Sequence, residues 1–163
     1  ARLDNAGQAV ALNKQDHARW NRDMIAEGVV LTERALARGK VGPFQIKAAI
    51  AACHCEGETS DWPQIAALYD VLLNFENTPI VRLNRAVAIA EAGRLQAALV
   101  EIEALSGELD EYQPYQAAKA DLSARAAMFH AAKSAYAKAI ELTTSPADAA
   151  FLEKKLHQLL ADA

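Results

Sequence analysis

Hydrophobic residues recur at intervals of three and four positions along most of the chain, which is the spacing of one face of an α-helix. The pattern predicts a long first helix over residues 16–39. Asp16 suits its N-cap and Gly39 its C-terminal stop. One stripe of this helix consists of Trp20, Met24, Gly28, Leu31 and Ala35.

Prolines mark the starts of the later helices. Pro43, Pro79, Pro114 and Pro146 each stand just before a helical pattern, and proline suits the first helical position because its missing N–H would be unpaired there. Thr78 and Ser145 can cap two of these starts. The pattern predicts helices at about 43–56, 62–75, 79–92, 95–106, 114–127, 129–142 and 146–160. Residues 1–14 are interpreted as a turn that a short strand can follow.

A repeat with a period of about 34 residues underlies these helices. Six positions have a counterpart one repeat later: Ala86, Gly93, Leu95, Ala98, Ile102 and Leu105 correspond to Ala120, Ala127, Phe129, Ala132, Tyr136 and Ala139. A looser copy at nearly the same spacing, comprising Trp62, Ile65, Tyr69 and Leu72, precedes Leu95, Ala98, Ile102 and Leu105. The pattern resembles the tetratricopeptide repeat, in which small residues let paired helices approach closely and bulky ones fill the next groove. We therefore expect an all-α, tetratricopeptide-like right-handed superhelix of antiparallel helix hairpins. The alternative is an irregular, alanine-rich helical bundle.

Composition agrees with packed helices. The 163 residues suffice for one domain, and the 52% of apolar residues include few aromatics, so small side chains dominate the predicted core. A net charge of -4 gives no basic excess of the kind that binds nucleic acid. No apolar run has transmembrane length and no signal peptide is recognised, so we expect a cytoplasmic protein. The expected domain covers residues 16–163, preceded by a linker over 1–15.

The stretch Cys53-His54-Cys55-Glu56 contains residue types that bind metals. In the repeat, however, Cys53 falls at the small buried position of Ala86 and Ala120. A zinc site usually has four ligands, and two cysteines separated by one helical residue point about 200° apart. We therefore expect Cys53 to pack in the core and His54 to lie on the concave side. A metal or thiol sensor that uses Cys53 and Cys55 is the alternative.

No other catalytic constellation is recognisable. The sequence has no glycine-rich phosphate loop, no G-x-S-x-G and no H-E-x-x-H motif. We therefore expect a protein that is not an enzyme and that uses no cofactor and no metal.

Several stretches resemble one protein family along nearly the whole chain. They are "QDHARW" at 15–20, "GPFQIKAAIAACH" at 42–54, "DWPQIAALYDVL" at 61–72 and "LNRAVA" at 83–88. They are similar to the C-terminal extension of bacterial RNA polymerase sigma factors of the extracytoplasmic-function type that contain a tetratricopeptide-repeat domain. The chain departs from the family at His17, where arginine is usual. It also departs at Glu91-Ala92-Gly93-Arg94, where the family has an acidic-glycine-glycine-proline type of turn.

The resemblance implies a regulatory, protein-interaction module that modulates transcription initiation through contacts with the sigma core or RNA polymerase. The implied partners are sigma regions 2 and 4 of the same polypeptide and RNA polymerase, with DNA contacted only through those upstream regions and no membrane involved. A homodimer through an exposed edge helix is left open. The alternative function is a stand-alone adaptor that binds a peptide or small ligand in its concave groove.

Seven residues are the candidates for protein interaction. The segment from Gln15 to Trp20 is expected to bridge to the linker and the DNA-binding regions, although capping by Asp16 and core packing of Trp20 are alternatives. Asn84 can recognise a partner or bond a neighbouring helix terminus, and Arg85 can pair with a local carboxylate instead. The full set is Gln15, Asp16, Arg19, Trp20, His54, Asn84 and Arg85.

Overall fold

The computed structural model describes residues 7, 9–10, 14–55 and 59–161. Within them a short 3-10 helix, η2 (His17–Arg19), precedes eight α-helices. These are α1 (Arg22–Ala37), α2 (Pro43–Cys55), α3 (Trp62–Leu72), α4 (Pro79–Glu91), α5 (Leu95–Glu103), α6 (Gln113–Arg125), α7 (Phe129–Leu142) and α8 (Pro146–Ala161). The all-α prediction is confirmed for these residues. Most of the turn and strand expected within 1–14 lies outside the described residues, as does Glu56.

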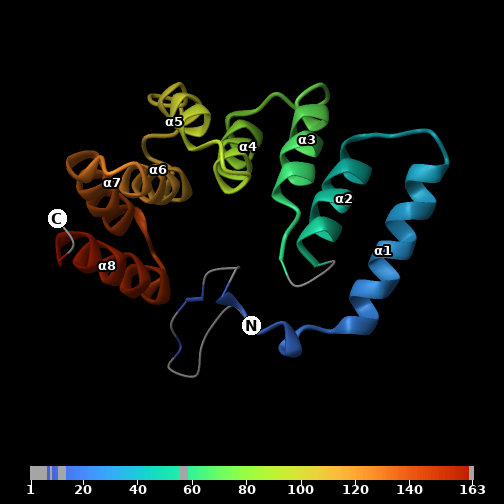
Figure 1. Ribbon diagram of the computed structural model, residues 1–163, viewed down its shortest axis with the longest axis horizontal. Coiled ribbons are helices and arrows are strands. Elements are labelled where there is room, and N and C mark those ends of the chain that lie inside the picture. Colours follow the sequence, from blue (N-terminus) through green and yellow to red (C-terminus); the bar gives the residue numbers. More distant parts are fainter. Residues whose placement is uncertain (1–6, 8, 11–13, 56–58, 162–163) are drawn as a thin grey trace.

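The helices follow one another along an arc, with α1 at one end and α8 at the other (Figure 1). Each helix contacts the next one in the chain, and α4 also contacts α6. Residues 14–20, which precede α1, lie between the two ends of the arc (Figure 1). Among the described helices, none combines the length and the apolar character needed to cross a membrane.

Helix starts follow the predicted caps. The Thr78 hydroxyl accepts a hydrogen bond from the Val81 amide at 3.3 Å at the start of α4. The Ser145 hydroxyl accepts one from Asp148 at 3.3 Å at the start of α8. Each cap satisfies an amide that has no partner within its own helix. Asp61 caps α3 in the same way, with its carboxylate 3.0 Å from the Gln64 amide.

The single first helix expected over 16–39 is wrong. Asp16 caps only the 3-10 helix, through a hydrogen bond of 2.9 Å from the Ala18 amide. The backbone is extended at Trp20, and α1 begins at Arg22 because the Asn21 side chain accepts from the Met24 amide at 3.1 Å. Two cap residues thus stand close together, and the second one starts the helix. The predicted stop at Gly39 is confirmed, with φ at +69°.

Repeat positions occupy equivalent places. Ala86, Ala98, Ala120 and Ala132 are completely buried, so nothing larger than a methyl group separates the helices there. The turns also match, because Gly93 and its counterpart Ala127 both have positive φ, at 86° and 57°. The repeat spacing seen in the sequence is therefore also a spacing of structural environments between α4 and α7.

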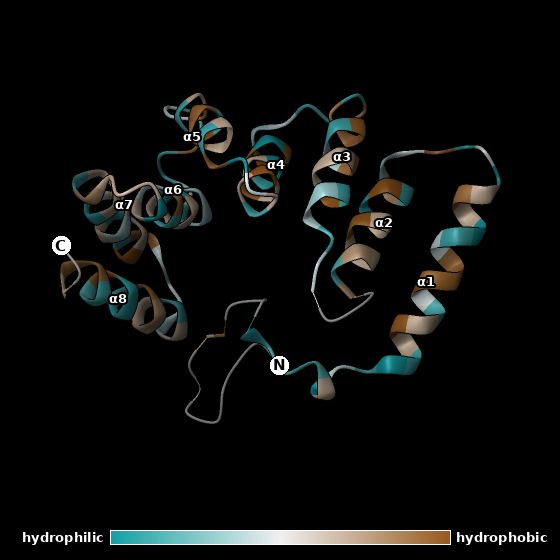
Figure 2. Cartoon of the chain, viewed as in Figure 1, coloured by the Kyte–Doolittle hydropathy of each residue, from teal (hydrophilic) through white to brown (hydrophobic). Residues whose placement is uncertain are grey.

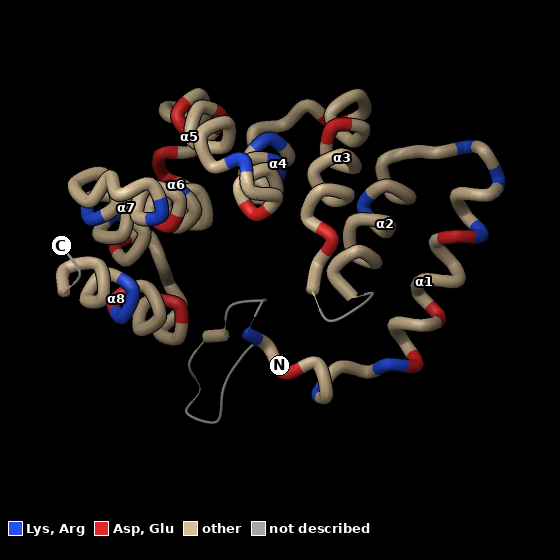
Figure 3. Tube along the Cα trace, in the orientation of Figure 1, with Lys and Arg blue, Asp and Glu red and all other residues tan. Residues whose placement is uncertain are grey.

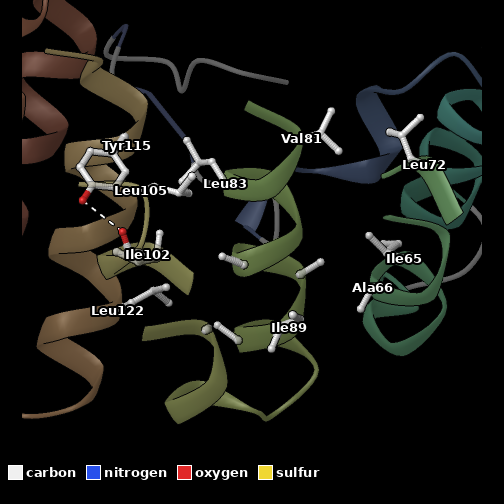
Figure 4. Close-up of a cluster of buried hydrophobic side chains, with 14 of the residues drawn as sticks. Ile65, Ala66, Leu72, Val81, Leu83, Ile89, Ile102, Leu105, Tyr115 and Leu122 are labelled. Carbon is white, nitrogen blue, oxygen red and sulfur yellow. Dashed lines mark hydrogen bonds between the residues drawn. The ribbon is translucent and has the colours of Figure 1, made fainter. Parts of the chain in front are cut away.

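The core is built from two clusters of buried side chains. The larger one extends from α2 to α6, and the smaller one joins α6, α7 and α8. Figure 4 shows the larger cluster, in which the fully buried Tyr115 of α6 donates a hydrogen bond of 3.1 Å to the Ile102 carbonyl of α5. Cys53 packs against this cluster, as expected from its repeat position.

The stripe identified in the sequence is mostly exposed in α1. Met24 is 69% exposed and Leu31 56% exposed, and α1 has no buried residue. A different row, with Ile25, Val29 and Thr32, faces α2 across a hollow of about 230 Å³, which Gly28 also lines. The helix carries two apolar rows, and α2 is the one helix with which it makes extensive contact in the described part. Only one row can therefore face α2, and Met24 and Leu31 of the other row remain on the surface. Figure 2 shows that hydrophobic residues recur along α1.

Candidate interaction groove

A hollow of about 360 Å³ lies where the N-terminal segment faces α3, α4, α6, α7 and α8. We call it the inner groove, and of the residues before α1 Lys14 lines it. Its walls are formed by Lys14, Trp62, Val87, Glu91, Ala117, Asp121, Tyr136, Phe151, Leu152 and Lys155.

Repeat spacing explains why these residues meet. Val87, Asp121 and Lys155 follow one another at intervals of one repeat on α4, α6 and α8, and all three line the groove. Ala117 and Phe151 show the same spacing and also line it. Successive repeats therefore contribute the same helix face to one continuous wall.

Charged side chains form a ladder along this wall. Arg125 of α6 pairs with Glu91 of α4 through one guanidinium nitrogen and donates to the Ala90 carbonyl at 3.1 Å through the other. Asp121 lies 3.7 Å from Arg125 and 3.5 Å from Lys155 of α8. We call Glu91, Arg125, Asp121 and Lys155 the charge ladder. It alternates in sign and joins three helices, and its exposure keeps each pair weak.

Aromatic and aliphatic side chains supply the rest of the groove. Trp62, Phe151 and Tyr136 approach it from α3, α8 and α7. Burial, helped by the Asp121 charge, raises the pKa of Tyr136 to about 12. The Tyr136 side chain is only 3% exposed, so it contributes mainly apolar packing to the wall of the groove. An apolar surface bordered by both signs of charge suits an amphipathic polypeptide segment.

His54 lies beside the groove residue Trp62. Its ring is edge-on to the Trp62 ring, with centroids 5.1 Å apart, and its Nδ1 is 3.0 Å from the Ser60 hydroxyl. Burial lowers the pKa of His54 below the usual 6.5, so the neutral ring is favoured near neutral pH. His54 precedes the groove residue Val87 by 33 residues but does not itself line the groove.

Residues predicted in the N-terminal segment hold that segment together. The Gln15 amide nitrogen is 3.4 Å from the Val10 carbonyl, and Asp16 caps η2. The half-buried Trp20 stacks on His17 with ring centroids 4.0 Å apart. Arg19 is exposed on η2. None of these four candidates lines the inner groove.

Asn84 and Arg85 are adjacent in the sequence, but their side chains lie on different sides of α4. Asn84 is exposed and lines a second hollow, of about 300 Å³, together with Lys47 and other residues of α2, α3 and α4. Arg85 turns to the other side and pairs with Asp70 of α3 at 2.5 Å and with Glu101 of α5. Burial alone would lower the pKa of Arg85, but these two carboxylates outweigh it and raise the pKa. Arg85 therefore connects three helices.

The groove residues of α6, α7 and α8 are missing from the candidates derived from the sequence. The repeat contains the signal that identifies most of them. Val87, Asp121 and Lys155 follow His54 in the sequence at intervals of 33, 34 and 34 residues. All three of these residues line the inner groove.

Cys53 and Cys55 have different surroundings. Cys53 packs against the core, whereas Cys55 lines the hollow between α1 and α2. Across the described residues, no three side chains of His, Cys, Asp or Glu gather in a way that could hold a metal ion.

Comparison with known proteins identifies one long relative. The chain is 36% identical over 165 residues to an uncharacterized protein of Rhizobium meliloti (strain 1021), and the match covers 99% of the chain. The chain spans only 39% of the length of that relative. No protein-family model and no solved structure matches the chain.

Proposed function

We propose that this chain is a tetratricopeptide-like interaction domain, a right-handed superhelix of antiparallel hairpins that binds a polypeptide segment in its inner groove. The observation that carries the proposal is the regular repeat spacing of groove residues on α4, α6 and α8. Such spacing is what stacked repeats with a shared concave surface require. The alternating charges and apolar wall of the groove support a peptide-like ligand.

We further propose that the domain is the C-terminal extension of an extracytoplasmic-function sigma factor and modulates transcription initiation. Support comes from the stretches at 15–20, 42–54, 61–72 and 83–88, which resemble that family. The length of the Rhizobium relative agrees with a domain that belongs to a larger protein. In this proposal the groove contacts the sigma core or RNA polymerase, and the upstream regions contact DNA.

Charge distribution supports a protein partner over direct DNA binding. Acidic and basic residues alternate along the charge ladder, and both signs are interspersed over the helices (Figure 3). A DNA-binding face would concentrate lysine and arginine. The groove instead offers paired charges that a partner segment with both signs can complement.

The test is runoff transcription with reconstituted RNA polymerase. Sigma regions 2 and 4 encoded in frame with this chain would be assayed alone and with the chain added in trans. We expect the chain to change transcript yield severalfold. A Val87→Arg variant should lose this effect, because the new side chain enters the inner groove. The fold should tolerate arginine there, since the equivalent positions hold Asp121 and Lys155.

The matched control is Val100→Arg. Val100 is 72% exposed on α5 and does not line the groove, so this variant should act like the unchanged chain. Equal transcript yields with and without the chain would refute the regulatory role. Absence of sigma regions upstream of the chain would favour the stand-alone adaptor instead.

A further inference from the structure

We infer that the exposed row of α1 is a homodimer interface, in which α1 packs antiparallel against α1 of a second copy. The row consists of Met24, Gly28, Leu31 and Ala35, and we call it the α1 seam. The inference concerns the end of the arc away from α8 and does not depend on what the inner groove binds.

Met24, Gly28 and Leu31 of the α1 seam are exposed, and Ala35 is half-buried. Met24 is 69% exposed and Leu31 56% exposed, while a methyl group added at Gly28 would meet nothing within 4 Å. The row that faces α2 contains Ile25, which lies about 100° from Met24 around the helix. Gly28 belongs to both rows, because it also lines the hollow toward α2. A second helix can therefore approach Met24 and Leu31 from the side of α1 that α2 leaves uncovered.

Spacing within the seam favours an antiparallel pair of identical helices. The intervals of four, three and four residues match alternating core positions of a coiled coil. In an antiparallel arrangement centred between Gly28 and Leu31, Met24 faces Ala35 of the second copy and Leu31 faces its Gly28. Each large side chain then meets a small one. A two-fold axis relates the two copies, so each contact between the helices occurs twice, as in any isologous interface.

Charge complementarity selects the same register. Glu27 and Arg34 lie seven residues apart on one flank of the α1 seam. Antiparallel helices bring like flanks together, so Glu27 faces Arg34 of the second copy and Arg34 faces its Glu27. Within the chain, neither residue forms an ion pair with another described residue. The pairing of large with small side chains and the pairing of Glu27 with Arg34 thus indicate the same antiparallel register.

The dimer should be weak. One helix of 16 residues offers less than the roughly 1,200 Å² that stable interfaces usually bury, which points to a dissociation constant on the order of 10–100 µM. Sedimentation equilibrium from about 1 µM to about 1 mM would detect it. Higher salt should weaken association, because the pairs of Glu27 and Arg34 are exposed.

Charge variants provide the decisive test. Glu27→Arg places arginine opposite Arg34 twice in the dimer, and we expect it to weaken association about tenfold. The double variant Glu27→Arg with Arg34→Glu restores opposite charges across the seam and should recover the dimer. Since the two positions are not neighbours within one helix, the swap should leave the monomer unchanged.

Leu31→Glu is the complementary variant, with Val30→Glu as its control. Leu31 lies in the seam, whereas Val30, which is 42% exposed, lies on another side of α1. We expect only Leu31→Glu to abolish the dimer, with circular dichroism showing an intact fold in both variants. A chain that is monomeric up to about 1 mM would overturn the inference. So would a charge swap that fails to restore association, or equal losses from both glutamate variants.

Discussion

Ala127 has a backbone conformation that residues with a side chain rarely adopt, with φ at 57°. Gly93 has a similar conformation at the equivalent turn, one repeat earlier, and its φ is 86°. Glycine adopts positive φ without the steric cost that a Cβ atom brings. The repeat therefore requires this conformation at both turns, whichever residue is present.

Reciprocal substitutions at these turns should have opposite effects. Ala127→Gly should stabilise the chain by about 1 kcal/mol, because it removes the strain of positive φ. Gly93→Ala should destabilise it by about 1 kcal/mol for the converse reason, since an added Cβ meets no atom within 4 Å and only the backbone is strained. Urea denaturation would measure both values. Effects of the same sign would contradict the equivalence of the two turns.

His54 should make stability depend on pH. Burial lowers its pKa from 6.5, so the unfolded chain takes up a proton at a higher pH than the folded chain does. The stability that neutral His54 contributes is complete above about pH 6.5 and is lost as the pH falls toward the folded-state pKa. We expect the melting temperature to fall between about pH 7.5 and pH 5.5, and to fall less in a His54→Gln variant.

The exposed His130 provides the control for this measurement. A His130→Gln variant should keep the pH dependence of the unchanged chain. If both variants showed the same pH dependence as the unchanged chain, protonation of His54 would not be coupled to folding.

At the scale of single helices, the sequence predicts starts better than packing faces. Thr78, Ser145 and the prolines identify where α4 and α8 begin, because caps and proline act through local geometry. Which face of α1 packs cannot be read from its local sequence, because it depends on the helices around it. Its two apolar rows are equally plausible in the sequence, and only the position of α1 at the end of the arc leaves Met24 and Leu31 uncovered.

The contact between α5 and α6 depends on a buried hydrogen bond. Tyr115 is fully buried, and its hydroxyl donates to the Ile102 carbonyl. Tyr115→Phe should therefore reduce the free energy of unfolding by about 1 kcal/mol, because the carbonyl loses its buried partner. Tyr112→Phe, at a side chain that is 37% exposed, should change stability little. Equal losses in the two variants, measured by urea denaturation, would argue against a role for the hydrogen bond.

At the scale of the whole molecule, the sequence repeat accounts for the positions of the residues that line the inner groove. The sequence predicts the helices and places His54 on the concave side, but it does not rank Asp121, Tyr136 or Lys155 as candidates. These residues look ordinary in isolation, because their proximity depends on the stacking of helices from successive repeats. Arg85 shows the reverse case, since its carboxylate partners lie 15 and 16 residues away and make it a link between helices.

The most direct test of the account measures binding between this chain and the sigma regions 2 and 4 that the proposal places upstream of it. The account predicts saturable binding of the unchanged chain, a dissociation constant at least about tenfold weaker for Val87→Arg, and unchanged affinity for Val100→Arg. Isothermal titration calorimetry would provide all three values. Absence of binding, or equal affinities for the two arginine variants, would contradict the proposal that the inner groove is the interaction site.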